Sequence, residues 1–238
     1  MKSKLVSSLV CLGLVTVWSS VNPGDVRAQD KPKVQVKIPE PGVPQVMTME
    51  GKFVRAAYNN EGYVILGYQA SNRSVGEEWM LLEVGMTVLG KTPDFTMLRN
   101  AFSLETPDGK TIALPTITEH RQANTRALQE RAKIQRDSIN YFPVEAHNAC
   151  AIVFFPDLTS RALPRDDIEL SSNRACLGRL FFRVPGGIAY GQHWLNVKFE
   201  KSLIRVPFRI LTEEEEKLLS KNYKDISKQV EEAFKKKN

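Results

Sequence analysis

Histidine and cysteine, two residue types that often carry catalysis or metal binding, each occur only three times in this 238-residue chain. His147 follows Glu145 and precedes Cys150 by three residues, a loose metal-like spacing. A closed zinc site needs three or four ligands in matched geometry, and the sequence offers no complete set without Cys150. His193 lies in a strand-like run, where a hydrogen-bonded structural histidine is the expected interpretation.

Acidic residues gather in one stretch of the second half of the chain. Such oxygen ligands bind calcium when a loop folds them around one point. The stretch lacks the Asp-x-Asp-x-Asp-Gly spacing of calcium loops, and Arg161 and Arg165 lie among the acids. Local ion pairing is therefore the favoured interpretation for the four acids Asp157, Asp166, Asp167 and Glu169.

Motifs of covalent catalysis are missing. The chain contains no Gly-x-Ser-x-Gly nucleophile elbow, and Pro185-Gly186-Gly187 is typical of a turn, not of a phosphate-binding loop. Paired carboxylates for glycoside hydrolysis are set by space and not by sequence. We expect no catalytic residue, metal or cofactor, and keep a hydrolase whose site is assembled in the fold as the alternative.

The N-terminus has the three parts of a secretory signal peptide, predicted for residues 1–28. Lys2 and Lys4 precede an uncharged apolar stretch from Leu5 to Trp18, and Val26-Arg27-Ala28 places small residues where cleavage occurs. The apolar stretch is too short to cross a bilayer core of ~30 Å comfortably. The alternative is an uncleaved anchor. No later segment is long and apolar enough to span a membrane.

Removal of residues 1–28 changes both the charge and the cysteine count. It leaves 30 basic and 26 acidic residues, a net charge of +4, which is too mild to predict nucleic-acid binding. It also leaves an even pair, Cys150 and Cys176, which in an oxidising compartment predicts a disulfide. Alternation along their strands directs both thiols to the core. Two separately buried free thiols are the alternative.

The rest of the mature chain is mostly strand-like. Residues 29–50 carry four prolines and are expected to form an extended linker. Strands separated by turn signals such as Asn59-Asn60-Glu61-Gly62 and Pro107-Asp108-Gly109 then predict a β-sandwich over residues 51–211. Tyr63–Ala70 is apolar on both faces, which is typical of a central strand covered on both sides. The other expected strands span 52–58, 79–89, 97–105, 110–114, 149–155, 168–171, 175–184, 192–200 and 203–210.

One polar helix is expected to interrupt the strands at about residues 117–137. Thr116 and Glu119 have capping-box spacing, and no Gly or Pro follows within the helix. Its charged face is typical of a surface element, so we expect it to connect two groups of strands and His120 to be solvated. A binding helix is the alternative.

A second helix is predicted from residue 212 to the end. Thr212 and Glu215 again have capping-box spacing, and basic residues gather at the negative end of the helix dipole. A narrow apolar seam is expected to dock either onto the protein's own sheet or onto a protein partner or second copy. The seam consists of Leu219, Tyr223, Ile226, Val230 and Phe234.

Two short stretches carry a family resemblance. The hairpin sequence Phe102–Lys110, with its Asp-Gly turn, together with Gly178–Pro185, with its Phe-x-Val-Pro end, resembles secreted bacterial immunoglobulin-like domains of unknown function. The resemblance covers about residues 51–210, with the helix at 117–137 as a departure. It implies an antiparallel sandwich and a cell-envelope context, and it transfers no catalytic residue.

The hypothesis from sequence is an exported, non-catalytic binding or structural module of the periplasm or cell surface. Its fold class is mainly β, an immunoglobulin-like antiparallel sandwich with an inserted polar helix and a C-terminal amphipathic helix. Besides the hydrolase, a carbohydrate- or ligand-binding sandwich is kept as an alternative. That alternative requires exposed aromatic side chains such as Trp79 or Trp194 along one face.

Overall fold

A computed structural model describes residues 45–135, 138–157 and 162–235. The predicted signal peptide, the predicted linker up to residue 44 and the last two residues of the predicted inserted helix lie outside these ranges, as does the side chain of Phe234. The described part is mainly β, as predicted, with several antiparallel pairings and a long C-terminal helix.

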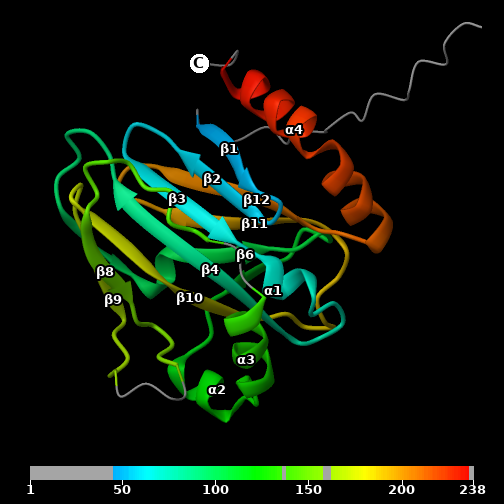
Figure 1. Ribbon diagram of the computed structural model, residues 1–238. Helices are drawn as coiled ribbons and strands as arrows, with labels where there is room; N and C mark the ends of the chain where they lie inside the picture. The colour runs from blue at the N-terminus through cyan, green and yellow to red at the C-terminus, as the bar shows by residue number, and fades with distance from the viewer. Residues whose placement is uncertain (1–44, 136–137, 158–161, 236–238) are drawn as a thin grey trace, which may run out of the picture. The chain divides into compact units, whose positions relative to one another are not determined.

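The larger sheet has six strands in the order β1-β2-β3-β4-β10-β8 (Figure 1). Its neighbours pair antiparallel except β10 and β8, which run parallel. A parallel pair needs a crossover between its strands, and residues 153–173 supply it. The strands are β1 (Val46–Gly51), β2 (Val54–Tyr58), β3 (Gly62–Gly67), β4 (Trp79–Val88), β8 (Asn148–Ile152) and β10 (Arg174–Arg183).

A four-stranded antiparallel sheet in the order β12-β11-β6-β7 packs against the larger one. Aromatic side chains join the two layers: Phe208 of the smaller sheet lies 5.2 Å, between ring centroids, from Tyr68, which follows β3. A separate two-stranded sheet pairs β5 with β9. The strands are β5 (Phe95–Leu98), β6 (Phe102–Glu105), β7 (Thr111–Ala113), β9 (Asp167–Leu170), β11 (Gly191–Lys198) and β12 (Leu203–Ile210).

Strand β3 is a central strand with both faces covered, as its apolar sequence predicts. Val64, Ile65 and Leu66 are each fully buried. On the face turned away from the smaller sheet, Ile139 and Phe142 of the segment after α3 pack over Ile65 and its neighbours. Alternation alone cannot reveal such a strand, because a run that is buried on both sides has no polar period.

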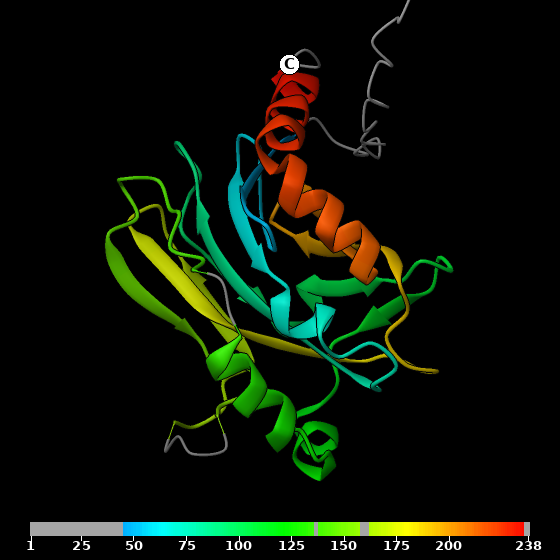
Figure 2. The ribbon, with the colours of Figure 1, turned by 45° about the vertical axis from the view of Figure 1, so that its right-hand side comes forward.

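Four helices complete the described chain: α1 (Gln69–Asn72), α2 (Ile117–Gln122), α3 (Arg126–Ile134) and α4 (Glu213–Lys235). The two capping boxes predicted at their starts are present. Thr116 and Glu119 bond reciprocally at α2, and Thr212 and Glu215 do so at α4. Figure 2 shows α2 and α3 together at one end of the sheets and α4 near the other.

Several expectations about secondary structure need correction. The strand expected at 63–70 ends at Gly67, and residues 69–72 form α1. Residues 46–50, assigned to the extended linker, form the edge strand β1 together with Gly51, because Met47 and Met49 bury their side chains in the core. The single helix expected at 117–137 is two helices with a break at residues 123–125. The single strand expected at 97–105 is split by a short 3-10 turn (η1, Arg99–Ala101), which passes the chain from the β5–β9 pair to the four-stranded sheet.

Candidate functional site

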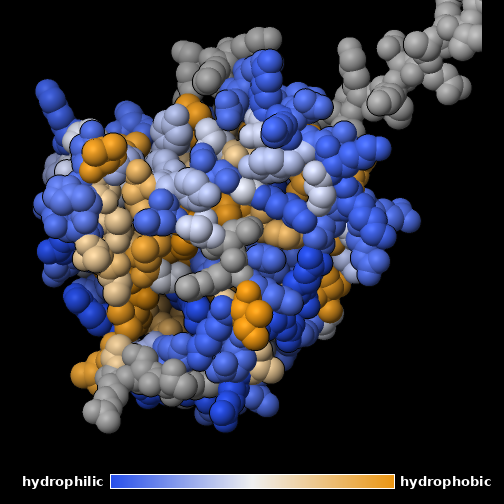
Figure 3. Space-filling model, viewed as in Figure 1, coloured by the Kyte–Doolittle hydropathy of each residue, from blue (hydrophilic) through white to orange (hydrophobic). Residues whose placement is uncertain are grey.

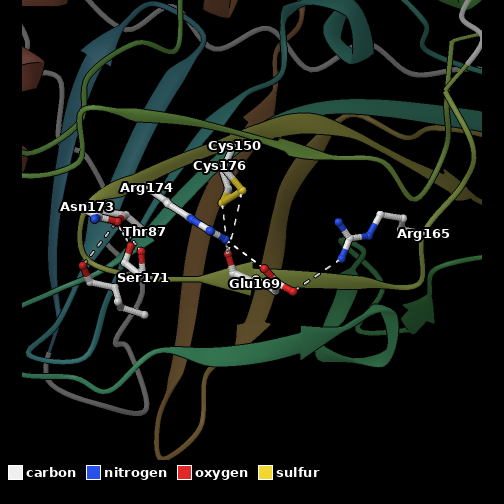
Figure 4. The surroundings of a disulfide bond; sticks show 9 residues. Thr87, Cys150, Arg165, Glu169, Ser171, Asn173, Arg174 and Cys176 are labelled. Atoms are coloured by element: carbon white, nitrogen blue, oxygen red, sulfur yellow. Dashed lines mark hydrogen bonds and ion pairs between the residues drawn. A yellow bond between two sulfur atoms is a disulfide. The ribbon is translucent and has the colours of Figure 1, made fainter.

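The predicted disulfide is present and joins the last two strands of the larger sheet (Figure 4). The register of the parallel pair places Cys150 of β8 directly opposite Cys176 of β10. Cys176 is fully buried. Cys150 is only half buried, because no strand of the described residues lies beyond β8. The expectation that both thiols point into the core therefore holds fully for Cys176 alone.

Strand β9 crosses beside this disulfide. The carbonyl oxygen of Glu169 lies 3.8 Å from Sγ of Cys176 and 4.0 Å from Sγ of Cys150. A disulfide sulfur carries no hydrogen, so these are packing contacts and not hydrogen bonds. Because Cys150 is oxidised, it supplies no thiolate to the zinc site considered for His147. Within the described ranges, no three His, Cys, Asp or Glu side chains gather to hold a metal ion.

A cavity of about 880 Å³ opens between β8 and β9, and we call it the β8 groove. One wall is the edge of β8, the other is β9 with the residues leading into β5, and Cys150 lies between them. Figure 3 shows a stripe of apolar surface at the left of the molecule, where Figure 1 places β8 and β9, with hydrophilic side chains on its margins. The polar lining comprises Asp94, Thr96, Asn148, Arg165, Asp167, Glu169, Ser171, Asn173 and Arg174.

Two of the three acids that line the groove are paired with arginines, which agrees with the ion-pairing interpretation of the acidic stretch. Arg174 Nη1 lies 3.1 Å from Glu169 Oε2, and Arg165 Nε lies 3.2 Å from Asp167 Oδ1. Arg165 also approaches Glu169 at 3.9 Å. These pairs are exposed, and such pairs contribute little to stability. Their effect is to line the groove with both signs of charge.

The backbone of β8 presents hydrogen-bonding groups to the groove. Asn148 N–H donates inward to the Asn173 carbonyl at 2.8 Å, so by alternation Cys150 and Ile152 also direct their backbone groups toward β10. Ala149 and Ala151 therefore direct their N–H and C=O groups outward. The next outward carbonyl, that of Val153, accepts from Arg165 N–H at 3.0 Å, which confirms the alternation.

The other edges of the two large sheets are covered or interrupted. Helix α4 lies along β1, and Tyr223 Oη donates to the Met49 carbonyl at 2.9 Å. At β12, the Gln45 amide both donates to and accepts from the Arg205 backbone, at 2.7 and 3.1 Å, and Pro207 removes one donor. Strand β7 has only three residues. Natural proteins protect sheet edges by these means, and β8 has none of them in the part of the chain described.

The apolar seam of the last helix is largely used within the chain. Leu219, Ile226 and Val230 are buried on the side of α4 that contacts β1, and Tyr223 is held by its bond to β1. At its start, α4 is fixed by Glu216, which lies 2.6 Å from Arg73. Of the two alternatives considered for the seam, the geometry favours docking onto the protein's own sheet. Association with a partner through these side chains stays a prediction.

His120 differs from its expected solvated state. It is buried among aromatic rings, with its centroid 4.5 Å from Phe181 and 4.8 Å from Phe155. Burial, assisted by the nearby charge of Arg99, lowers the pKa of His120 to about 4. The break after α2 explains the difference, because a short separate helix turns this residue into the core while its neighbours Arg121 and Gln122 stay exposed.

The indoles considered for carbohydrate binding are not displayed on an open face. Trp194 is buried, with the Arg205 guanidinium 4.6 Å from its ring centroid. Trp79 is half buried and packs edge-on to His120 at 6.1 Å. Neither ring offers the free flat surface that stacking on a sugar requires.

One carboxylate cluster bears on the hydrolase alternative. Arg179 lies between Glu83 and Asp157, at 3.6 and 3.5 Å, beside a cavity of about 580 Å³. Both carboxylates share this guanidinium, so the arrangement neutralises buried charge and does not provide a separate acid and base. Sequence reasoning missed the cluster, since its members come from three distant segments.

Comparison of the chain with protein-family models, with curated proteins and with solved structures finds no match in any of the three. Function must therefore be argued from the site itself.

Proposed function

We propose that this protein is an exported, non-catalytic binding module of the periplasm or cell surface, and that the β8 groove binds an extended segment of a partner protein. The segment adds to the larger sheet as one more strand beside β8. In this mode, main-chain hydrogen bonds supply affinity, and alternate side chains supply specificity.

The edge of β8, which no element of the described ranges covers, is the observation that carries the proposal. Its outward backbone groups at Ala149 and Ala151 face the groove, and both side chains are small and exposed. An edge with no lysine, proline, bulge or covering helix is a template for another strand. The disulfide holds this strand to β10, so the template is ordered before a ligand arrives.

The lining of the groove indicates the kind of segment that fits. Arg165 and Arg174 line the groove together with Asp167 and Glu169. A segment carrying both acidic and basic side chains can exchange partners with these exposed pairs, whereas a strongly charged one meets repulsion from half of them. The five residues of β8 span about 17 Å, enough for a segment of four or five residues.

Export and fold class complete the proposal. The signal-peptide pattern and a disulfide both belong to an oxidising compartment. Among the helices described, none is long and apolar enough to cross a membrane. Two packed β-sheets support immunoglobulin-like character as part of the proposal, although here the disulfide joins neighbouring strands, whereas in antibody domains it links the two sheets.

The test uses one backbone donor of β8. Peptides of about ten residues that bind the mature chain are selected from a displayed library, and their affinities are compared for wild type, Ala151→Pro and Ala151→Val. Proline removes the outward N–H without breaking a bond to β10, and valine keeps it. We expect at least a tenfold loss for Ala151→Pro and a change within about twofold for Ala151→Val. Equal affinity for all three would refute strand addition at β8.

A further inference from the structure

The sequence that precedes the described ranges contains a stretch suited to the edge of β8. Residues 33–38 read Lys-Val-Gln-Val-Lys-Ile, so polar and apolar side chains alternate over six positions. A period of two is that of a β-strand with one apolar face. Pro39 follows at once and disfavours helical backbone at Ile38. We call residues 33–38 the N-terminal segment.

The charges around the N-terminal segment complement those of the β8 groove. Residues 30–40 carry three lysines, one aspartate and one glutamate, a net charge of +1. The groove is lined by three acids and two arginines, a net charge of −1. Asp167 and Glu169 are paired with the arginines, whereas Asp94 makes no ion pair within the described ranges. A lysine of the N-terminal segment therefore has an acid to pair with.

The apolar side of the N-terminal segment also has a counterpart. By alternation, its two valines and its isoleucine share one face. In the lining of the groove, Ala149 and Ala151 are exposed, and Phe95 and Val153 are half buried. β-Branched side chains suit a pleated, half-buried surface of this kind. The segment thus matches the groove in both charge and hydropathy.

The N-terminal segment is too near to β1 along the chain to reach β8 of its own molecule. The registers place Met47 of β1 in one row with Cys150 of β8. A strand added beyond β8 lies six strand spacings from β1, or about 29 Å. Eight residue steps join Ile38 to Val46, and a proline-rich chain of that length spans about 25 Å. The straight path also runs through the packed sheet, so a route around it is longer.

We propose that the partner of the β8 groove is a second copy of this chain, whose N-terminal segment adds to the larger sheet beside β8. The inference rests on the strand addition proposed above and names its partner. Each copy has one segment, leading into β1, and one open edge at β8, so the contact is head-to-tail. The segment must be ordered when it binds, so we expect a Kd on the order of 0.1 mM. In dilute protein the edge of β8 is therefore open.

Sedimentation equilibrium of the mature chain, from about 10 μM to 1 mM, tests this contact. Wild type is expected to self-associate over this range. Gln35→Pro/Val36→Pro removes two successive N–H groups, one of which faces β8 in either register, and should stay monomeric. Gln35→Thr/Val36→Ile keeps both N–H groups and the tendency to form a strand, and its Kd should stay within about threefold of wild type. Both positions precede the described fold.

A mixture of two variants tests the direction of the contact. Ala151→Pro keeps the N-terminal segment and loses the edge, whereas Gln35→Pro/Val36→Pro keeps the edge and loses the segment. Each should be monomeric alone, and the mixture should form a one-to-one dimer. If Ala151→Pro does not fold, a synthetic peptide of residues 31–41 replaces it. The peptide should bind Gln35→Pro/Val36→Pro protein at least tenfold more tightly than the same peptide carrying both prolines.

The outcomes separate this proposal from strand addition itself. Association that persists in Gln35→Pro/Val36→Pro would show that the copies meet through another surface and would overturn the proposal. A wild type that is monomeric at about 1 mM, while selected peptides still bind wild type and not Ala151→Pro, would overturn the second copy as partner and leave strand addition intact. Amides of Ala149 and Ala151 that are protected in the monomer, and exposed by Gln35→Pro/Val36→Pro, would assign the segment to its own chain and also overturn the proposal.

Discussion

The disulfide is predicted to hold β8 in the sheet, and its removal tests how strongly. Cys150 and Cys176 are separated by 26 residues along the chain. The chain-entropy relation gives about 3.5 kcal/mol for opening a loop of that length. Reduction of the wild-type protein should therefore lower the free energy of unfolding by about this amount. The double variant Cys150→Ala/Cys176→Ala should lose about 1 kcal/mol more, because it also removes atoms from the buried Cys176 site.

Denaturant unfolding of the three states provides the measurement. The reduced protein and the double variant should both show an increased m-value, because an unfolded chain without the cross-link exposes more surface. Peptide affinity at the β8 groove should fall in parallel, since a strand that frays no longer presents Ala149 and Ala151 in order. A loss below about 1 kcal/mol in both cases would show that other contacts hold β8, and the reasoning from the edge position would be wrong.

Two further predictions concern the core and the last helix. His120 has a pKa of about 4 in the folded protein and an ordinary value of 6.5 when unfolded, so between these pH values the unfolded state binds more protons. The free energy of unfolding should therefore fall by about 2 kcal/mol from pH 7.5 to pH 5. Urea titrations at each pH measure this fall, and His120→Phe should reduce it. Leu219→Ala and Ile226→Ala each truncate a side chain buried on α4. Each should lower the free energy of unfolding by about 2 kcal/mol and leave the sedimentation coefficient unchanged. A change in oligomeric state with unchanged stability would instead favour the partner role of the seam.

The mainly β class, the disulfide and both capping boxes follow from local patterns in the sequence. A capping box needs only residues three apart, and the cysteine pair needs only the count that remains after export. The features that the sequence does not reveal depend on which elements pack against each other in the fold. Strand β1 begins within the expected linker, since a proline-rich composition hides the alternation of Met47 and Met49. The burial of His120 depends on a break in a helix that contains no Gly or Pro.

The β8 groove likewise depends on tertiary arrangement that local sequence patterns do not show. The sequence draws attention to Cys150 for its sulfur, whereas the features that make β8 a candidate binding edge are its place at the end of the sheet and the outward direction of two alanine backbones. Neither has a side-chain signature. The small residues on both sides of Cys150 are the signal available in the sequence, and they become meaningful only once β8 is known to have a neighbour on one side.

Amide hydrogen exchange at β8 tests the central claim most directly. In the free mature protein, the N–H groups of Ala149 and Ala151 should exchange fast, while those of Cys150 and Ile152, which face β10, should be protected. Saturation with a selected peptide should protect the two alanine amides and leave β1 under α4 unchanged. Alanine amides that are already protected without peptide, or that stay unprotected at saturation, would contradict strand addition at this edge.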